Sequence, residues 1–271
     1  MDEVLRALLG VEPSVALATA LVNANVAGGL AIGVVALAHP FTRRRLGPET
    51  ACSLWTAPLI VALAFAVIRH AQIASGHRAP MFAASPQLDF ALAVWAFGGL
   101  AMAASFAWAQ ARFMAEVRAG RAGPAVVGLI SPRIILPAHG YTPEERELIR
   151  AHEREHVSRK DPRAAALAAV FQCLGWFNPM VHLAARLLRL DQELSCDAAV
   201  VRSRPTARTL YARTLLKTQL AATPLPFGCY FGAHPLEVRV EMLKRRPGKR
   251  AARPTAAGHA IVHATGDIIR P

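Results

Sequence analysis

The stretch that decides the fold reads HEREH over residues 152–156. On an α-helix, side chains four positions apart lie one turn apart on the same face, so His152 and His156 can reach one metal ion. Glu153 would lie beside that metal, where it can take a proton from a bound water. The pattern predicts a zinc site whose third protein ligand is a later carboxylate, and Glu193 is the candidate.

The residues around this stretch favour the helix that such a site requires. Thr142 is a suitable N-cap, Pro143 fits the first helical turn, and Glu145 completes a T-x-x-E capping box. The proline at 162 ends the helix, because the residue before a proline avoids the helical conformation. We therefore predict a metal helix over residues 143–159.

The composition indicates a membrane protein. Of the 271 residues, 54% are hydrophobic and only 18% are charged, which is too apolar for an ordinary soluble domain. Three runs without charged side chains each reach the roughly 18–20 residues that a bilayer span needs. They cover residues 14–38, 50–68 and 90–111, so we expect a membrane domain over residues 1–111.

The arginines indicate the orientation of these spans. Three of them, at 43–45, follow the first span, whereas only Arg6 precedes it. Positive charge stays on the cytoplasmic side, so we expect the N-terminus outside and the C-terminal part in the cytoplasm. The net charge of +13 suits a domain that lies against anionic lipid. Direct nucleic-acid binding is not expected, since the arginines are spread out and form no recognised reading motif.

A further apolar stretch at 164–190 is interrupted by Gly175 and by Asn178-Pro179. Its first twenty residues could pass for a fourth span. If they crossed the bilayer, however, Glu193 would lie on the opposite side from the two histidines. We therefore predict a membrane-associated helical hairpin whose tip, residues 176–179, dips into the membrane interface, where tryptophan is favoured.

The remaining segments carry weaker signals. Residues 112–123 read as a polar linker, and the β-favouring runs 125–129 and 133–136 predict a hairpin. Such a strand could hold an extended substrate by backbone pairing, and a purely structural hairpin is an equally good interpretation. Asp197 lies one turn after Glu193, where it can accept a hydrogen bond from a ligand histidine, or it is a solvated helix residue. Residues 247–271 read as a flexible basic tail.

Five stretches together resemble the BlaR/MecR-type membrane zinc peptidases. They are SPRIILP at 131–137, HEREHVSRKD at 152–161, WFNP at 176–179, ELSCD at 193–197 and HPLEVRVEML at 234–243. The resemblance covers about residues 10–246. It implies three N-terminal spans and then a cytoplasmic gluzincin-like α+β peptidase domain over 112–246. It also implies zinc on His152, His156 and Glu193, with Glu153 catalytic.

The family's sensor-transducers carry a fourth span and an extracellular penicillin-binding domain after the peptidase. Only 28 residues follow Leu243 here, so we expect that sensor to be lacking. His234, Tyr211 and Arg239 lie in or near the matching stretches and are candidate catalytic donors to the reaction oxyanion.

The expected function is that of an integral membrane zinc endopeptidase in the bacterial plasma membrane. It would cut a protein at the cytoplasmic face, and by the same resemblance its substrate would be a DNA-binding repressor or the chain itself. The charged flanks of HEREH exclude a lipid-embedded protease of the site-two type. The alternative is a non-catalytic membrane signalling scaffold with a structural zinc. Whether the chain forms a homodimer stays open.

Overall fold

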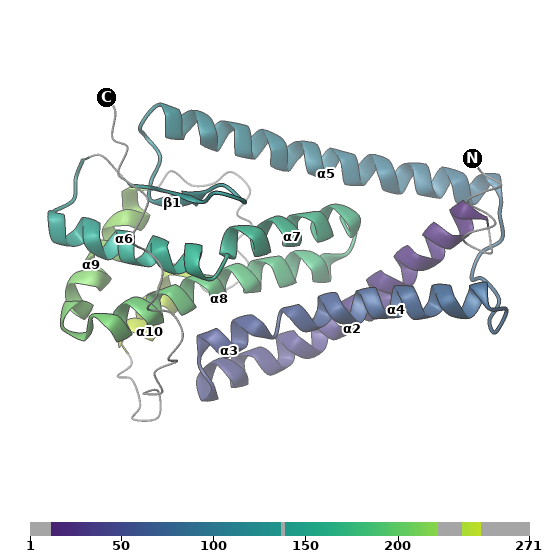
Figure 1. Cartoon of the computed structure of the whole chain (residues 1–271), viewed down its shortest axis with the longest axis horizontal. Coiled ribbons are helices and arrows are strands. Elements are labelled where there is room, and N and C mark those ends of the chain that lie inside the picture. The colour runs from purple at the N-terminus through teal and green to yellow at the C-terminus, as the bar shows by residue number, and fades with distance from the viewer. Residues whose placement is uncertain (1–11, 137–138, 222–234, 245–271) are drawn as a thin grey trace.

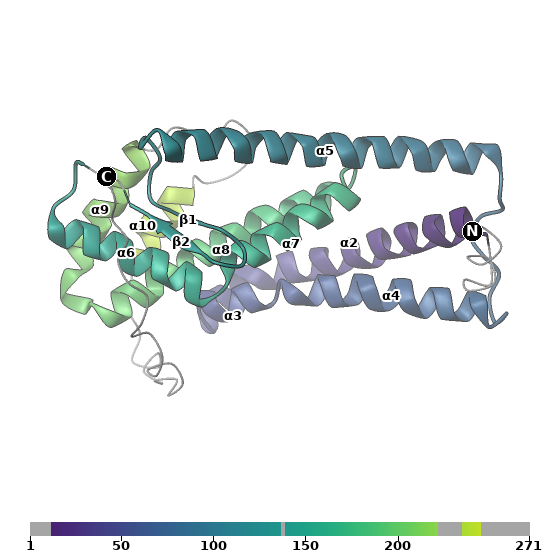
Figure 2. The same ribbon diagram turned by 45° about the horizontal axis from the view of Figure 1, so that its top comes forward.

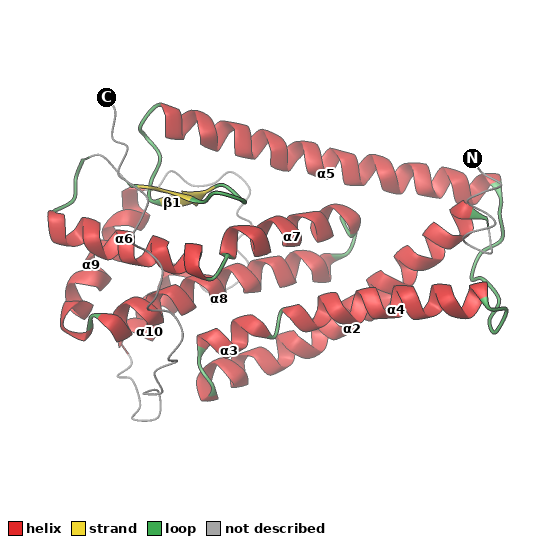
Figure 3. Cartoon of the chain, in the orientation of Figure 1, coloured by secondary structure: helices red, strands yellow, loops and turns green. Residues whose placement is uncertain are grey.

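The computed structural model describes residues 12–136, 139–221 and 235–244, and the structural statements below refer to these residues. Within them the protein is mainly helical, with one pair of short strands (Figure 3). Long helices form one end of an elongated molecule, and shorter helices and the strand pair form the other (Figure 1). The predicted class, a mainly α membrane protein with a small sheet, is confirmed.

Three helical segments are long and apolar enough to cross a membrane. They are α2 (Pro13–Arg45), the pair α3 (Pro48–Ser53) and α4 (Thr56–Ala74), and α5 (Pro86–Arg118). The three predicted spans are therefore confirmed. The linker predicted from residue 112 is wrong at its start, because α5 continues to Arg118. Residues 112–118 contain neither glycine nor proline, so nothing in them ends the helix.

The two strands form the predicted hairpin. β1 (Ala125–Val127) and β2 (Arg133–Ile135) pair antiparallel and lie against α6. Gly128 begins the turn between them with φ +103°, and a Cβ there would lie 2.6 Å from the carbonyl oxygen of Ser131. Only glycine fits this position, which is why the strands are interrupted here.

Helix α6 (Pro143–Ser158) carries the HEREH stretch and begins at the predicted capping box. The Thr142 hydroxyl accepts a hydrogen bond from the Glu145 backbone nitrogen at 3.2 Å, and the Glu145 carboxylate accepts one from the Thr142 nitrogen at 2.9 Å. Lys217 of α9 (Arg208–Ala221) contacts the same carboxylate at 2.8 Å. The start of the metal helix is thus fixed both locally and by a neighbouring helix.

The apolar stretch after α6 folds back on itself, as predicted. It forms α7 (Asp161–Leu174) and α8 (Pro179–Ser203), and α8 returns Glu193 to the side of α6. A short 3-10 turn (Pro205–Ala207) leads into α9, and α10 (Pro235–Lys244) packs against α8 and α9. Apolar side chains from all four helices around the site form its core: Leu148, Ala151, Val200, Tyr211, Leu215 and Leu243. Residues 247–271 lie outside the described part of the chain.

The tip of the α7–α8 hairpin lies between α5 and α2 (Figure 2). The indole of Trp176 donates to the carbonyl of Trp95 at 3.1 Å, and the indole of Trp95 donates to the carbonyl of Leu174 at 2.8 Å. Trp95 precedes Arg112 by 17 residues, about 25 Å along α5. The tip therefore packs against the helices predicted to be spans, and its position at the membrane interface stays a prediction. Its polar groups find partners in the spans, so they do not need to stay near water.

The close approach of Trp176 to α5 gives a testable consequence. A Cβ added at Gly98 would lie 2.2 Å from the indole ring of Trp176. We expect Gly98→Ala to lower the stability of the detergent-purified protein by about 1–3 kcal/mol, because the hairpin tip must shift. Thermal unfolding measures this loss. Gly123→Ala, where a Cβ meets nothing within 4 Å, is the matched control. An equal effect of both substitutions would contradict the packing described here.

Candidate metal centre

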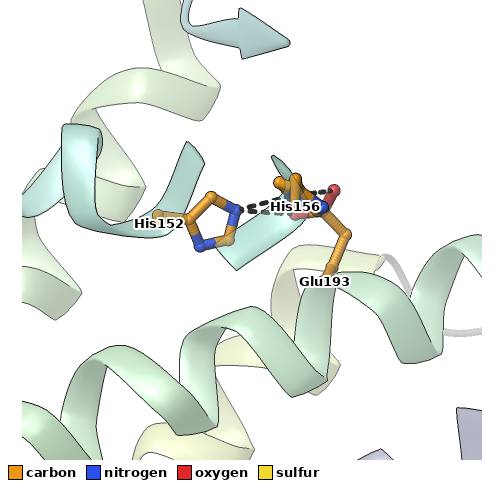
Figure 4. Close-up of side chains that lie close together, drawn as sticks. All are labelled: His152, His156 and Glu193. Atoms are coloured by element: carbon orange, nitrogen blue, oxygen red, sulfur yellow. Dashed lines mark hydrogen bonds and ion pairs between the residues drawn. The ribbon is translucent and has the colours of Figure 1, made fainter. Parts of the chain in front are cut away.

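Two helices bring three potential metal ligands together. His152 and His156 project from consecutive turns of α6, and Glu193 projects toward them from α8 (Figure 4). The Nε2 atoms of the two histidines are 3.1 Å apart. Glu193 Oε2 lies 3.4 Å from His152 Nε2, and Glu193 Oε1 lies 3.5 Å from His156 Nε2. The structure thus joins the three residues that the sequence analysis selected as ligands.

These separations fit zinc. With Zn–N and Zn–O bonds of about 2.0–2.1 Å, the corners of a tetrahedron lie roughly 3.3–3.4 Å apart. The two Nε2 atoms, 3.1 Å apart, and the 3.4 Å from His152 Nε2 to Glu193 Oε2 are close to that value, and the 3.5 Å contact of His156 Nε2 is with the other carboxylate oxygen, Oε1. Three protein donors would hold the ion and leave a fourth position for water or substrate. This is the ligand count of a catalytic zinc site.

The other ring nitrogen of each histidine faces a carboxylate. His156 Nδ1 donates to Asp161 Oδ2 at 2.8 Å. His152 Nδ1 lies 3.3 Å from Asp197 Oδ1 and 2.8 Å from the Tyr211 hydroxyl, which itself donates to Asp197 at 2.6 Å. A proton on Nδ1 leaves each Nε2 lone pair directed at the centre, and the carboxylates raise the basicity of both ligands. Asp197 therefore lies where the sequence analysis expected it.

The sequence analysis missed the role of Asp161. There it was only the residue before the proline that we expected to end the metal helix. Lys160 before it adopts a left-handed conformation, φ 60°, which turns the chain so that Asp161 faces back toward His156. The available signal was a carboxylate five positions after the second histidine, followed by the proline in the first turn of α7.

Arg239 of α10 connects Glu193 with Asp197. Its guanidinium donates two hydrogen bonds of 2.8 Å to the Asp197 carboxylate and lies 2.7 Å from Glu193 Oε2. Arg239 is 5% exposed and Tyr211 is 3% exposed. Their polar groups already contact carboxylates, which favours a supporting role for both over the predicted donation to an oxyanion. His234 lies outside the described residues.

The buried charges shift the pKa values of the site. Burial alone would lower the pKa of His152, but its hydrogen bonds to Asp197 and Glu193 outweigh burial and raise that pKa to about 10. Burial would raise the pKa of Glu193, yet the charge of Arg239 and the contact with His152 hold it well below its usual range. Without a metal, the site is therefore a protonated imidazole beside an ionised carboxylate.

Glu153 has a different environment. It is 7% exposed, and burial raises the pKa of its carboxyl group. A raised pKa makes the carboxylate a stronger base, as proton transfer near neutral pH requires. Cys196 is fully buried beside His156, at 3.4 Å from Nδ1, and burial raises the pKa of its thiol. A neutral thiol there is a packing residue, because zinc binds the thiolate.

Comparison with known proteins assigns this architecture to a family. The family model described as BlaR1 peptidase M56 matches residues 64–243, which include every described residue of the candidate centre. The regulatory protein BlaR1 of Bacillus licheniformis is 32% identical over 82 residues, 30% of this chain. The methicillin resistance mecR1 protein of Staphylococcus aureus is 33% identical over 82 residues, 29% of this chain.

The matched stretch amounts to 14% of each of these relatives. No solved structure matches the chain. The family model nevertheless covers well over half of the sequence, from α4 to α10. The resemblance to the BlaR/MecR-type peptidases is thereby confirmed, and this membrane protein belongs to the BlaR1 peptidase M56 family.

Proposed function

We propose that the protein is a zinc-dependent endopeptidase that cuts a protein substrate at the cytoplasmic face of the membrane. The close approach of His152, His156 and the Glu193 carboxylate, whose polar atoms lie 3.1 to 3.5 Å apart, carries this proposal. The hydrogen bonds behind each histidine support it, because they direct both Nε2 atoms toward one point. Family membership supports a peptidase activity in general.

Each residue of the centre has a distinct task in this reaction. Zinc held by the three ligands would lower the pKa of a bound water toward about 7 and polarise the substrate carbonyl. Glu153 takes the proton of the attacking water and then gives it to the leaving amine. Asp161 and Asp197 orient the two histidines, and Arg239 holds Glu193 and Asp197 in a fixed relation.

The strand pair beside α6 is the proposed docking edge for the substrate. Its sheet has only two described strands, so each strand pairs along one edge only. An extended peptide can pair with the free edge, and this brings its backbone to the metal helix. Pairing of this kind uses the backbone of the substrate, so it suits protein substrates of varied sequence.

The cytoplasmic orientation is part of the proposal. The three arginines at 43–45 form the last turn of α2, and His39 just before them contacts Asp191 on α8, two residues before Glu193. The basic end of the first span and the centre therefore lie on the same side. Because basic residues flank spans on the cytoplasmic side, the centre would face the cytoplasm.

The names of the relatives, a regulatory protein and a methicillin resistance protein, support a regulatory role. We propose regulated proteolysis of a DNA-binding repressor, or of the chain itself, as the biological reaction. A signalling scaffold with a structural zinc would bind the metal equally well. Peptide-bond cleavage that stops when a chelator removes the metal distinguishes the enzyme from the scaffold.

Glu153→Gln tests the proposed base. The amide keeps the shape of the side chain but cannot accept the proton, so we expect cleavage to fall by about 100-fold or more while zinc content stays near one per chain. Mass spectrometry of a digested peptide mixture and metal analysis measure the two quantities. Glu144→Gln, an exposed position in the first turn of α6, is the control. Undiminished cleavage by the Glu153 variant would refute the mechanism.

Zinc affinity should depend on pH through His152. In the metal-free protein this imidazole carries a proton below a pKa of about 10, and zinc must displace that proton to bind. Affinity therefore rises with pH, by about tenfold per unit between pH 6.5 and 8.5, if one proton is released. Competition with a chromogenic chelator measures the dissociation constant. A constant affinity over this range would show that His152 is neutral in the metal-free site.

Asp161→Asn tests the residue that the sequence analysis missed. The amide loses the negative charge that orients and polarises His156, so we expect zinc affinity to fall by about 10–100-fold. Asp161 also lies in the first turn of α7, where a carboxylate stabilises the helix. Asp89→Asn in the first turn of α5 controls for that effect. Equal zinc affinity in both variants would exclude Asp161 from the centre.

A further inference from the structure

A second buried polar cluster lies where the first span meets α8. Asp191 is fully buried, and its Oδ2 accepts hydrogen bonds from His39 Nε2 at 2.6 Å and from Trp55 Nε1 at 2.8 Å. His39 belongs to α2, and Trp55 lies between α3 and α4. His39 is 3% exposed and Trp55 is 8% exposed. None of the three residues is needed for the reaction proposed above.

Among the described residues, side-chain hydrogen bonds join α8 to α2 at two places, and this cluster is one of them. At the hairpin tip, Asn178 Nδ2 donates to Asn25 Oδ1 at 3.2 Å. The paired residues are 153 positions apart at the tip and 152 apart at Asp191, so α2 and α8 run parallel in nearly constant register. The two contacts are about 20 Å apart along α8.

An apolar interface fills the distance between the two polar contacts. Ile32 and Val35 of α2 are buried there, together with Trp55. They pack against side chains of α8: Met180, Val181, Ala184, Leu187 and Leu188. Apolar packing of this kind tolerates a small sliding of one helix along the other, whereas hydrogen bonds to a buried carboxylate do not. The polar ends therefore set the register.

The ligands of the candidate centre come from two helices, and different contacts hold each helix in place. His152 and His156 belong to α6, whereas Glu193 belongs to α8 and lies two residues after Asp191. The other oxygen of Asp191, Oδ1, has no hydrogen-bond partner among the described residues. The buried carboxylate thus depends on His39 and Trp55 for its hydrogen bonds. Losing either donor would leave the buried charge poorly compensated and would favour a shift of α8.

We propose that His39 and Trp55 are positioning residues of the metal centre. By holding Asp191, they fix the place of Glu193 relative to the histidine pair, and they tie the geometry of the centre to the arrangement of the first two spans. The inference rests on the proposed zinc site, because its consequence is a change in metal coordination.

Cobalt in place of zinc provides the test, since its visible absorption spectrum reports coordination geometry independently of catalysis. The full-length protein in detergent is titrated with Co²⁺. We expect His39→Leu and Trp55→Phe each to change the spectrum and to weaken Co²⁺ binding by about tenfold. His39→Gln retains an N–H donor and should restore much of the wild-type spectrum. Trp55→Phe retains an aromatic ring beside Ile32 and Val35, so it remains informative if His39→Leu does not fold.

Three controls separate positioning from general destabilisation. Val35→Ala weakens the same interface without touching the polar contacts, so it should lower the thermal stability but keep the cobalt spectrum. His77→Leu and Trp108→Phe change exposed residues of the same types and should have no effect. A spectral change in Val35→Ala equal to that in Trp55→Phe would overturn the inference.

The remaining outcomes distinguish this inference from the proposed function. If the wild-type protein binds Co²⁺ and Trp55→Phe keeps both spectrum and affinity, the positioning role is wrong and the metal site stands. If the wild-type protein binds no Co²⁺ at all, the proposed zinc site is wrong and the positioning role fails with it.

Discussion

The meeting of one carboxylate on α8 with two imidazoles on α6 is the constraint on which the rest of the structure depends. Glu193 can reach His152 and His156 only if the apolar stretch between them returns to its starting side. This requirement makes α7 and α8 a hairpin. It also brings a helix lined with apolar residues into the space between the spans, where the hairpin tip finds polar partners on α2 and α5.

Assembling these ligands concentrates charge in a buried place, and the surrounding helices balance it. Two carboxylates, of Glu193 and Asp197, share the guanidinium of Arg239, and the Tyr211 hydroxyl joins Asp197 to His152. A buried carboxylate without such partners would be strongly unfavourable. Helices α9 and α10 are thus part of the centre, although they supply none of its three ligands.

Some features could be predicted from the sequence because neighbouring residues determine them. One more, the hairpin, could be predicted because the chain must return to the metal helix. The capping box and the i, i+4 histidines depend on neighbouring residues, and the hairpin follows from the need to return Glu193. The partners of Tyr211 and Arg239 depend instead on how distant helices pack, which a single sequence does not encode in any short pattern. Asp161 was missed because a left-handed turn at Lys160 redirects it. The packing of the hairpin tip depends on Trp95, 81 positions away from Trp176.

The packing of the hairpin tip against α2 and α5 has a consequence for how the molecule can be divided. The boundary that we draw at residue 111 separates spans from peptidase along the chain, but the packing crosses it. The first half of α8 lies against α2, and α7 lies against α5. A catalytic fragment released at that boundary would expose Trp176, Met180 and their apolar neighbours to water. The first span therefore covers an apolar face of α8 that the helices around the candidate centre leave open, so the first half of α8 has its packing partners among the membrane helices.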